Sequence, residues 1–167
     1  LTGDTGSNSL NGAGGNDTLT GGAGSDIFFI WNGTADNSVD TITDFTAGLG
    51  GDRLSTFGLG FLTNYTFPDN PFASGHARLT QSGANTLVEV DPDGTIGAAV
   101  FQTVAILNNV TKSHLVADNL GGFDPNAIGG TAAADSLSGG AGNDEIYGFA
   151  GNDTVNGGGG NEVIYGE

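Results

Sequence analysis

A single apolar residue returns every nine positions near both ends of the chain, each time after a glycine-rich loop. The residues in this phase are Leu10, Leu19 and Phe28 in the first block and Leu137, Ile146, Val155 and Ile164 in the second. Because successive strand residues point to opposite faces, we expect each to be the inward-facing residue of a short strand. One buried side chain per strand is a thin core, so a single repeat is not expected to fold alone.

The polar positions keep the same period. Seven nonapeptides follow the template G-G-x-G-x-D-x-U-x, where U is apolar. They span residues 3–11, 12–20 and 21–29, and then residues 130–138, 139–147, 148–156 and 157–165. A fixed period with loop glycines is typical of a repeat architecture and not of an active site. The spacing therefore predicts two stacks of short strands, one near each end of the chain.

Glycine and acidic residues take fixed places in each loop. First-position glycines include Gly12, Gly21, Gly139, Gly148 and Gly157, and the fourth-position glycines are Gly6, Gly15, Gly24, Gly142, Gly151 and Gly160. The sixth position carries Asn8, Asp17, Asp26, Asp135, Asp144, Asp153 and Glu162. Glycine adopts positive φ at little steric cost, so a tight turn can bring backbone carbonyls to one point. Acidic side chains beside such carbonyls indicate calcium.

This pattern resembles the RTX family, the calcium-loaded parallel β-rolls of secreted bacterial proteins. The resemblance implies an all-β chain with parallel β-roll at residues 1–29 and 129–167 around a β-rich middle segment, residues 30–128. It implies that Ca²⁺ is held between consecutive loops of one edge, by the sixth-position carboxylates and by glycine-loop carbonyls. Two nonapeptides make one coil of such a roll. The stacked pairs are then Asn8 with Asp26, Asp135 with Asp153, and Asp144 with Glu162.

Several loops depart from the template. Asn8 brings no charge, Glu162 is one methylene longer than Asp, and Ala133 replaces the turn glycine. Asp17 has no partner at the expected spacing within the repeats. The alternative interpretation is a series of ordinary Asp-Gly and Asn-Gly turns between short strands. Turn chemistry explains the residue types but not a strict nine-residue phase across consecutive repeats, so calcium ligation is favoured.

The middle segment contains all four prolines and has no nonapeptide phase. Its β-rich stretches are residues 26–31, 41–45, 77–81, 86–90 and 99–107. A segment of this kind is expected to form a small β-sandwich or a flattened extension of the roll. The motif Asp91-Pro92-Asp93-Gly94 predicts a turn, with a calcium pair of Asp91 and Asp93 as the alternative.

One part of the middle segment carries further candidate ligands. The motif D-T-I-T-D-F at residues 40–45, followed by G-D-R-L at residues 51–54, resembles the signature that follows RTX rolls in serralysin-type proteases and alginate epimerases. In that setting the acidic residues help to close the last calcium sites. The likeness implies Asp40 and Asp44 as ligands, with Asp40 serving the edge that holds Asp17. Alternatively, Asp40 and Asp44 are solvent-facing residues of an alternating strand.

Charge sets a further constraint. The chain has 19 acidic and 3 basic residues, a formal charge of −16, and neither repeat block contains Lys or Arg. Stacked loops of like charge repel, and divalent ions remove that repulsion, so calcium binding and folding are expected to be one event. Nucleic acid and anionic membrane surfaces are poor partners for this charge. There is no Cys for disulfides or metal sites, and no apolar run long enough for a transmembrane helix.

No enzyme is expected. The sequence has no H-E-x-x-H motif, no G-x-S-x-G elbow and no phosphate loop. His76 and His114 are the only imidazoles, and we interpret them as packing or surface residues.

Three functions remain. The favoured one is a calcium-dependent structural module of a secreted Gram-negative bacterial protein, such as a surface layer, filament or adhesin. The resemblance implies type I export to the extracellular space or cell surface, and open roll ends indicate self-association or contact with neighbouring RTX modules. The alternatives are the export and folding appendage of a hydrolase or epimerase, and a carbohydrate-binding or ice-binding module that uses Trp31. Because the chain starts and stops in mid-repeat, we expect a piece of a longer polypeptide.

Overall fold

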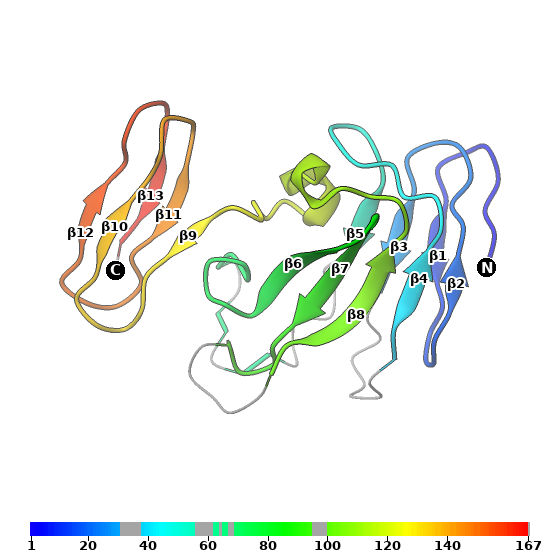
Figure 1. Cartoon of the computed structure of the whole chain (residues 1–167), viewed down its shortest axis with the longest axis horizontal. Coiled ribbons are helices and arrows are strands. Elements are labelled where there is room, and N and C mark those ends of the chain that lie inside the picture. The colour runs from blue at the N-terminus through cyan, green and yellow to red at the C-terminus, as the bar shows by residue number, and fades with distance from the viewer. Residues whose placement is uncertain (31–37, 56–61, 64, 67–68, 95–99, 167) are drawn as a thin grey trace.

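The structure is a computed structural model that describes residues 1–30, 38–55, 62–63, 65–66, 69–94 and 100–166, so Trp31 lies outside it. Its strands are β1 (Ser9–Asn11), β2 (Thr18–Leu19), β3 (Ile27–Phe29), β4 (Asp40–Ile42), β5 (Arg53–Ser55), β6 (Ala77–Ser82), β7 (Asn85–Val90), β8 (Gln102–Leu107), β9 (Ile128–Gly129), β10 (Ser136–Ser138), β11 (Glu145–Tyr147), β12 (Thr154–Asn156) and β13 (Val163–Tyr165) (Figure 1). Two 3₁₀ helices, η3 (Lys112–His114) and η4 (Ala117–Leu120), follow β8. Within these described ranges, no helix is long and apolar enough to cross a membrane.

Two facing sheets make up the first roll, and successive repeats supply them alternately. In one sheet β1, β3 and β5 are parallel, with Leu10 beside Phe28 and Phe28 beside Leu54. In the other sheet β2 and β4 are parallel, with Leu19 beside Ile42. Leu19, Phe28 and Ile42 are fully buried. The nine-residue phase therefore aligns apolar side chains between the sheets, and the predicted parallel β-roll is confirmed.

The middle segment extends one sheet of this roll. β8 pairs in parallel with β4, β7 pairs antiparallel with β8, and β6 pairs antiparallel with β7. The result is a five-stranded sheet in the order β2-β4-β8-β7-β6, which is the flattened extension and not a separate sandwich. Val88, Val104 and Leu107 join the same core cluster as Leu10 and Leu19. The boundary expected at residue 29 thus falls inside a shared core, and we propose that residues 1–120 fold as one unit.

A buried asparagine fastens η4 to the loop before β5. The Asn119 Oδ1 atom accepts a hydrogen bond from Gly48 N at 2.8 Å. Its Nδ2 atom donates to the carbonyl oxygens of Gly48 at 3.0 Å and of Asp52 at 2.7 Å. Because a fully bonded buried amide rigidifies its surroundings, Asn119 fixes the loop that carries Asp52.

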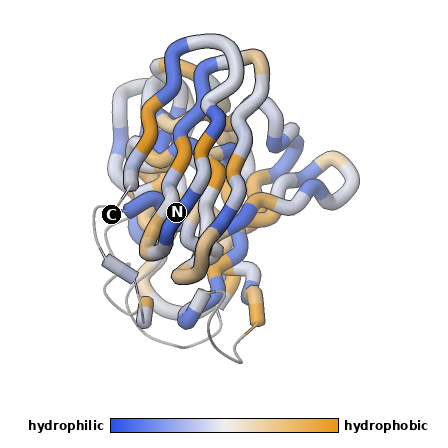
Figure 2. Tube along the Cα trace, turned by 90° about the vertical axis from the view of Figure 1, so that its left-hand side faces the viewer, coloured by the Kyte–Doolittle hydropathy of each residue, from blue (hydrophilic) through white to orange (hydrophobic). Residues whose placement is uncertain are grey.

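The second roll has the same construction but a thinner core. β10 pairs in parallel with β12, and β9, β11 and β13 form a parallel sheet in the order β13-β11-β9. Figure 2 shows apolar segments of neighbouring coils side by side, as stacked repeats require. Ile146 is fully buried on central β11, whereas Ile164 on edge strand β13 is 49% exposed. Few apolar side chains therefore hold this roll together.

One buried amide connects the second roll to the middle segment. Asn70 is 1% exposed, and its Nδ2 atom donates to Glu145 Oε2 on β11 at 3.0 Å. The same atom donates to the carbonyl oxygen of Asp124 at 2.9 Å. Removing either acceptor would leave a buried donor unsatisfied, so Asn70 favours one docked position of β11 against the loop before β6.

Candidate calcium-binding loops

Each sixth-position carboxylate folds back over the first-position glycine of its own repeat. A Cβ atom added to the glycine would lie 2.5 Å from Asp17 Oδ2 at Gly12, 2.8 Å from Asp144 Oδ2 at Gly139, and 2.9 Å from Asp153 Oδ2 at Gly148. A Cβ on Gly21 would overlap Asp26, and one on Gly157 would lie 2.9 Å from Glu162 Cγ. Only glycine leaves room for the carboxylate at this place, which explains its recurrence at the first position.

The fourth-position glycines lie where the loops turn most sharply. φ is +93° at Gly15, +120° at Gly24, +139° at Gly151 and +130° at Gly160. Gly6 and Gly142, in the loops beneath Gly24 and Gly160, do not have positive φ. A Cβ on Gly24 would lie 2.8 Å from the Gly6 carbonyl oxygen. The carbonyl of one loop therefore faces the turn of the loop stacked on it, and carbonyl oxygens are among the ligands that calcium takes.

Backbone hydrogen bonds show which sixth positions are stacked. Asn8 N donates to Asp26 Oδ1 at 2.8 Å, and Asp135 N donates to Asp153 Oδ1 at 2.9 Å. These are two of the pairs expected from the sequence. In the third pair the contact is through the backbone, because Val163 N, next to Glu162, donates to Asp144 O at 2.8 Å.

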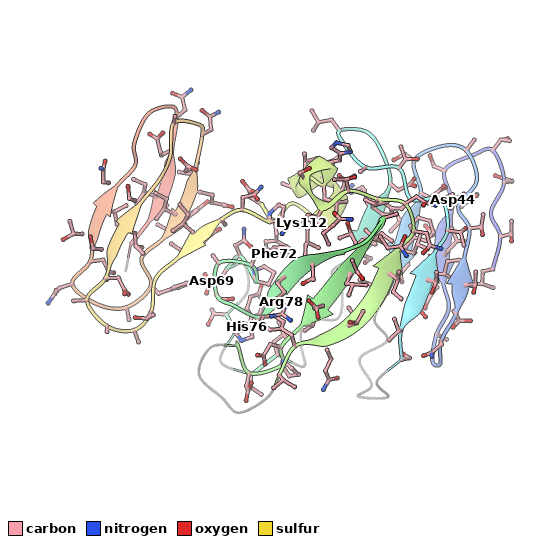
Figure 3. All side chains as sticks on the ribbon, in the orientation of Figure 1. Asp44, Asp69, Phe72, His76, Arg78 and Lys112 are labelled. Carbon is pink, nitrogen blue, oxygen red and sulfur yellow. The ribbon has the colours of Figure 1, made fainter. Side chains whose placement is uncertain are left out.

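The structure also places Asp40 and Asp44 against the loops. Asp17 N donates to Asp40 Oδ1 at 3.0 Å, and Asp40 is 4% exposed, so Asp40 takes the stacked place beside Asp17. Asp44 accepts hydrogen bonds from Gly21 N and Gly22 N, each at 2.9 Å, and Figure 3 shows it at the first roll. The solvent-facing alternative is therefore wrong for Asp40, whereas Asp44 is half-buried. Asp44 binds the loop amides directly, as an anion in a backbone nest.

Asp52 is a further candidate ligand that the nine-residue spacing does not reveal. Asp26 N donates to Asp52 Oδ1 at 2.8 Å, and Thr46 N donates to Asp52 Oδ2 at 2.7 Å. Asp52 is 2% exposed, and burial raises the pKa of its carboxyl. Asp52 thus extends the column of Asn8 and Asp26 by one level. The sequence does contain a sign of this position. Residues 50–54 match the second half of the repeat template, G-x-D-x-U, but they do not lie at a multiple of nine residues from the other repeats.

Two observations test whether these loops fit a cation. Asp17 Oδ2, Asp26 Oδ2 and Glu162 Oε1 are buried and have no hydrogen-bond partner. A buried carboxylate oxygen without a partner is costly, and a bound cation satisfies it. No three acidic or imidazole side chains gather at one point in the described ranges, so an ion needs backbone carbonyls as well. Calcium, which takes six to eight oxygens from carboxylates and carbonyls, fits this donor set.

The histidine in the middle segment is a packed residue. His76 directly precedes β6 (Figure 3) and is 3% exposed, and its Nδ1 atom lies 2.8 Å from Ser74 Oγ. Its Nε2 atom lies 2.9 Å from the Thr63 carbonyl oxygen. Both ring nitrogens are therefore engaged, which is the packing role expected from the sequence.

Comparison with known families agrees with this geometry. The sequence profile of the RTX calcium-binding nonapeptide repeat matches residues 1–34 and 129–166, in four copies. No curated protein matches the chain in a sequence search. The matched ranges coincide with the two rolls whose loops stack carboxylates over glycine turns. These two blocks are RTX calcium-binding nonapeptide repeats, as the sequence pattern implied.

Proposed function

We propose that this chain is a calcium-dependent structural module of a secreted bacterial RTX protein, which folds when it meets extracellular calcium. The observation that carries the proposal is the Asp26 carboxylate. The Asp26 side chain has no exposed surface. Its Oδ1 atom accepts a hydrogen bond from Asn8 N in the stacked loop, and its Oδ2 atom has no hydrogen-bond partner. In a chain of net charge −16, a cation at this oxygen offsets both the buried charge and the repulsion between loops.

The candidate ligands fall into four stacked groups. Asn8, Asp26 and Asp52 form one column with the loops of Gly6, Gly21 and Gly24, while Asp17 and Asp40 form the other edge of the first roll with Gly12 and Gly15. In the second roll Asp135 and Asp153 go with Gly148 and Gly151, and Asp144 and Glu162 go with Gly139, Gly142, Gly157 and Gly160. Bound calcium would supply positive charge between these loops. Asp44 supports the Gly21 loop from outside.

Coupling to calcium concentration gives the module its switch. Extracellular calcium modules bind with dissociation constants of about 10⁻⁴–10⁻³ M, so the loops stay empty where calcium is scarce. Each site adds about 1.4 kcal/mol of stability for every tenfold excess of calcium over its dissociation constant. Several coupled sites then give a steep transition from an expanded chain during export to a folded chain outside the cell.

The ligand assignment is tested by removing one charge from a stacked loop. We expect Asp153→Asn to raise the calcium concentration at the folding midpoint about tenfold, because the amide keeps one acceptor but loses the charge. Circular dichroism during a calcium titration measures this. Asp118→Asn is the matched control, since Asp118 also accepts one backbone amide, from Gly50 N at 3.0 Å, but outside the repeats. Equal midpoints for the two variants would remove Asp153 from the ligand set.

A role in a surface layer, filament or adhesin needs an assembly surface, and β13 offers one. It is the edge strand of its sheet, and Val163, Ile164 and Tyr165 are 50%, 49% and 48% exposed. An open strand edge with apolar side chains is a template for another strand. We propose that further repeat strands continue the roll here, from a neighbouring module or from a second copy.

Light scattering in calcium tests continuation by a second copy. The calcium-loaded chain is expected to show scattering that rises with protein concentration, and Ile164→Lys is expected to abolish the rise, because a charge at this inward position cannot be covered by a stacked coil. Leu49→Lys is the control, since Leu49 is 88% exposed and lies in the loop between β4 and β5, outside the second roll. A monomeric wild-type chain at all concentrations would leave neighbouring modules as the only occupants of β13.

The alternative function, an appendage that drives folding of a secreted hydrolase or epimerase, has one observation in its favour. Asp40, Asp44 and Asp52 close the first roll from the motif that resembles the roll-closing signature of such enzymes. Sequencing the parent gene separates the two functions, because further repeats around this module favour the structural role and a catalytic motif favours the appendage.

A further inference from the structure

The turn at residues 70–75 is anchored in the unit of residues 1–120. Phe72 packs against the hydrophobic core cluster of that unit. The Pro71 carbonyl oxygen accepts a hydrogen bond from Ala77 N at 2.9 Å, so the turn is fixed to the first residue of β6. Figure 3 shows Phe72 in the loop before β6, on the side of the sheet towards the second roll. The turn is therefore a fixed edge of the first unit.

The second roll contacts this turn through two neighbouring strands. On β9, a Cβ atom added to Gly129 would overlap the Ala73 carbonyl group, so the two backbones lie in direct contact. On β11, Glu145 Oε2 accepts a hydrogen bond from Asn70 Nδ2 at 3.0 Å. Asn70 is buried, and its Oδ1 atom accepts a hydrogen bond from Phe72 N at 2.9 Å. Because both ends of the amide are bonded, Asn70 holds Glu145 in one position.

The contact on β11 lies beside a candidate calcium-binding loop. Glu145 directly follows Asp144, the sixth-position carboxylate of its repeat. Asp144 Oδ2 accepts a hydrogen bond from Gly140 N at 2.8 Å, so the loop closes onto the residue that precedes β11. β9 is tied to the same strand, because Gly130 N donates to the Tyr147 carbonyl oxygen at 2.8 Å. The place of β11 therefore determines where the loop carboxylate lies.

The second roll has little apolar burial to order β11 without this contact. Among the described residues of the roll, the buried apolar side chains are Ile146 and Tyr147, both on β11 itself. A strand that is already held in place loses less conformational entropy when an ion orders its loop, so the ion binds more tightly. By linkage, the ion strengthens the docking of β11 by the same factor.

We propose that the turn at residues 70–75 is a folding template that lowers the calcium concentration at which the second roll folds, and that calcium in turn locks the joint between the two units. The joint consists of the contacts of Asn70 with β11 and of Ala73 with β9. This inference rests on the proposed calcium-dependent folding and adds to it a regulatory role for the middle segment. Asn70 is a positioning residue, because it acts on the Asp144 loop through Glu145.

Asn70→Ala tests the template, because it leaves every residue of the second roll unchanged. We expect it to raise the calcium concentration at the folding midpoint of the second roll about fivefold, the lower end of common coupling factors. Hydrogen exchange of the β11 peptides during a calcium titration measures this, and unchanged protection of β7 shows that the first unit is intact. Asn126→Ala is the matched control, since Asn126 is exposed and its Nδ2 atom donates to Asp124 Oδ1 at 3.3 Å, within the connection and not across the joint.

Gly129→Ala tests the joint from the side of the second roll. The chain has no Cys, so spin labels at Ser82→Cys and Ser138→Cys, both exposed and one on each unit, report the distance between the units. In saturating calcium we expect a narrow distance distribution in the otherwise wild-type chain and a broad one in Gly129→Ala, whose second roll is folded but released. Gly159→Ala is the matched control and should stay narrow, because nothing lies within 4 Å of its added Cβ.

The contrary results separate this inference from the proposed function. If calcium folds the second roll of the wild-type chain but Asn70→Ala keeps the wild-type midpoint, the template is refuted while calcium-dependent folding stands. If calcium leaves the protection of the wild-type second roll unchanged, the proposed function fails and the template with it. A narrow distance distribution in Gly129→Ala would overturn the locked joint. If Gly129→Ala does not fold at any calcium concentration, Asn70→Ala decides, because it alters no residue of the roll.

Discussion

Withdrawal of calcium is expected to unfold the second roll while much of the five-stranded sheet remains. The second roll buries only Ile146 and Tyr147 as apolar side chains among its described residues, whereas the core of the first unit runs from Leu10 to Leu120. Residues 129–166 also carry five acidic side chains and no Lys or Arg. Without a cation, little apolar burial opposes the repulsion between these loops.

Hydrogen exchange measured peptide by peptide, with calcium and with excess EGTA, checks this order. Protection of β10 to β13 should be lost at higher calcium than protection of β7 and β8. An internal control comes from the β6–β7 hairpin, which contains no repeat loop. Protection of the second roll that persists in EGTA would contradict the proposed coupling of calcium to folding, and simultaneous loss everywhere would contradict two separate units.

Alanine at Gly24 is expected to cost much more stability than alanine at Gly15, although both glycines occupy the fourth position of a repeat. Both have positive φ, so each alanine costs about 1–2 kcal/mol of backbone strain. At Gly15 nothing lies within 4 Å of the added Cβ, whereas at Gly24 it would lie 2.8 Å from the Gly6 carbonyl oxygen. The overlap forces the stacked loops apart, which adds about 1–3 kcal/mol.

Thermal unfolding in saturating calcium measures the difference between Gly24→Ala and Gly15→Ala. The Gly24 variant should also need more calcium to fold, because its ion loop is displaced. If the two variants lose equal stability, the loops of residues 6 and 24 are not in contact. If only Gly15→Ala raises the calcium concentration at the folding midpoint, the stacking order of the first roll is contradicted.

The features that follow from local spacing were predictable. A nine-residue period fixes which side chain points inward, so Leu19, Phe28 and Ile146 were expected inside and are fully buried. The stacking of Asp40 beside Asp17 followed from a motif likeness and not from the period, since the two are separated by 23 residues. Ligation itself stays a prediction for every residue named as a ligand.

The features that depend on distant pairing were not predictable. Nothing in residues 102–107 indicates that β8 lies beside β4, because strand preference depends on the neighbour that the fold supplies. Asp52 lies 26 residues after Asp26, so a search at the repeat spacing passes over it. Positive φ at Ala13 and Phe149 was also missed, since the template assigns the turn to the fourth position and these residues occupy the second.

The junction of β4 with β8 gives the first roll a polarity. A spiral grows by adding parallel strands through crossover loops, and the antiparallel β7 that follows β8 cannot present such a loop. On the same side of the other sheet, η4 packs against β5. Both sheets are thus covered at the end formed by β4 and β5, whereas β1 and β2 lie at the opposite edges. The middle segment therefore terminates the first roll on one side only.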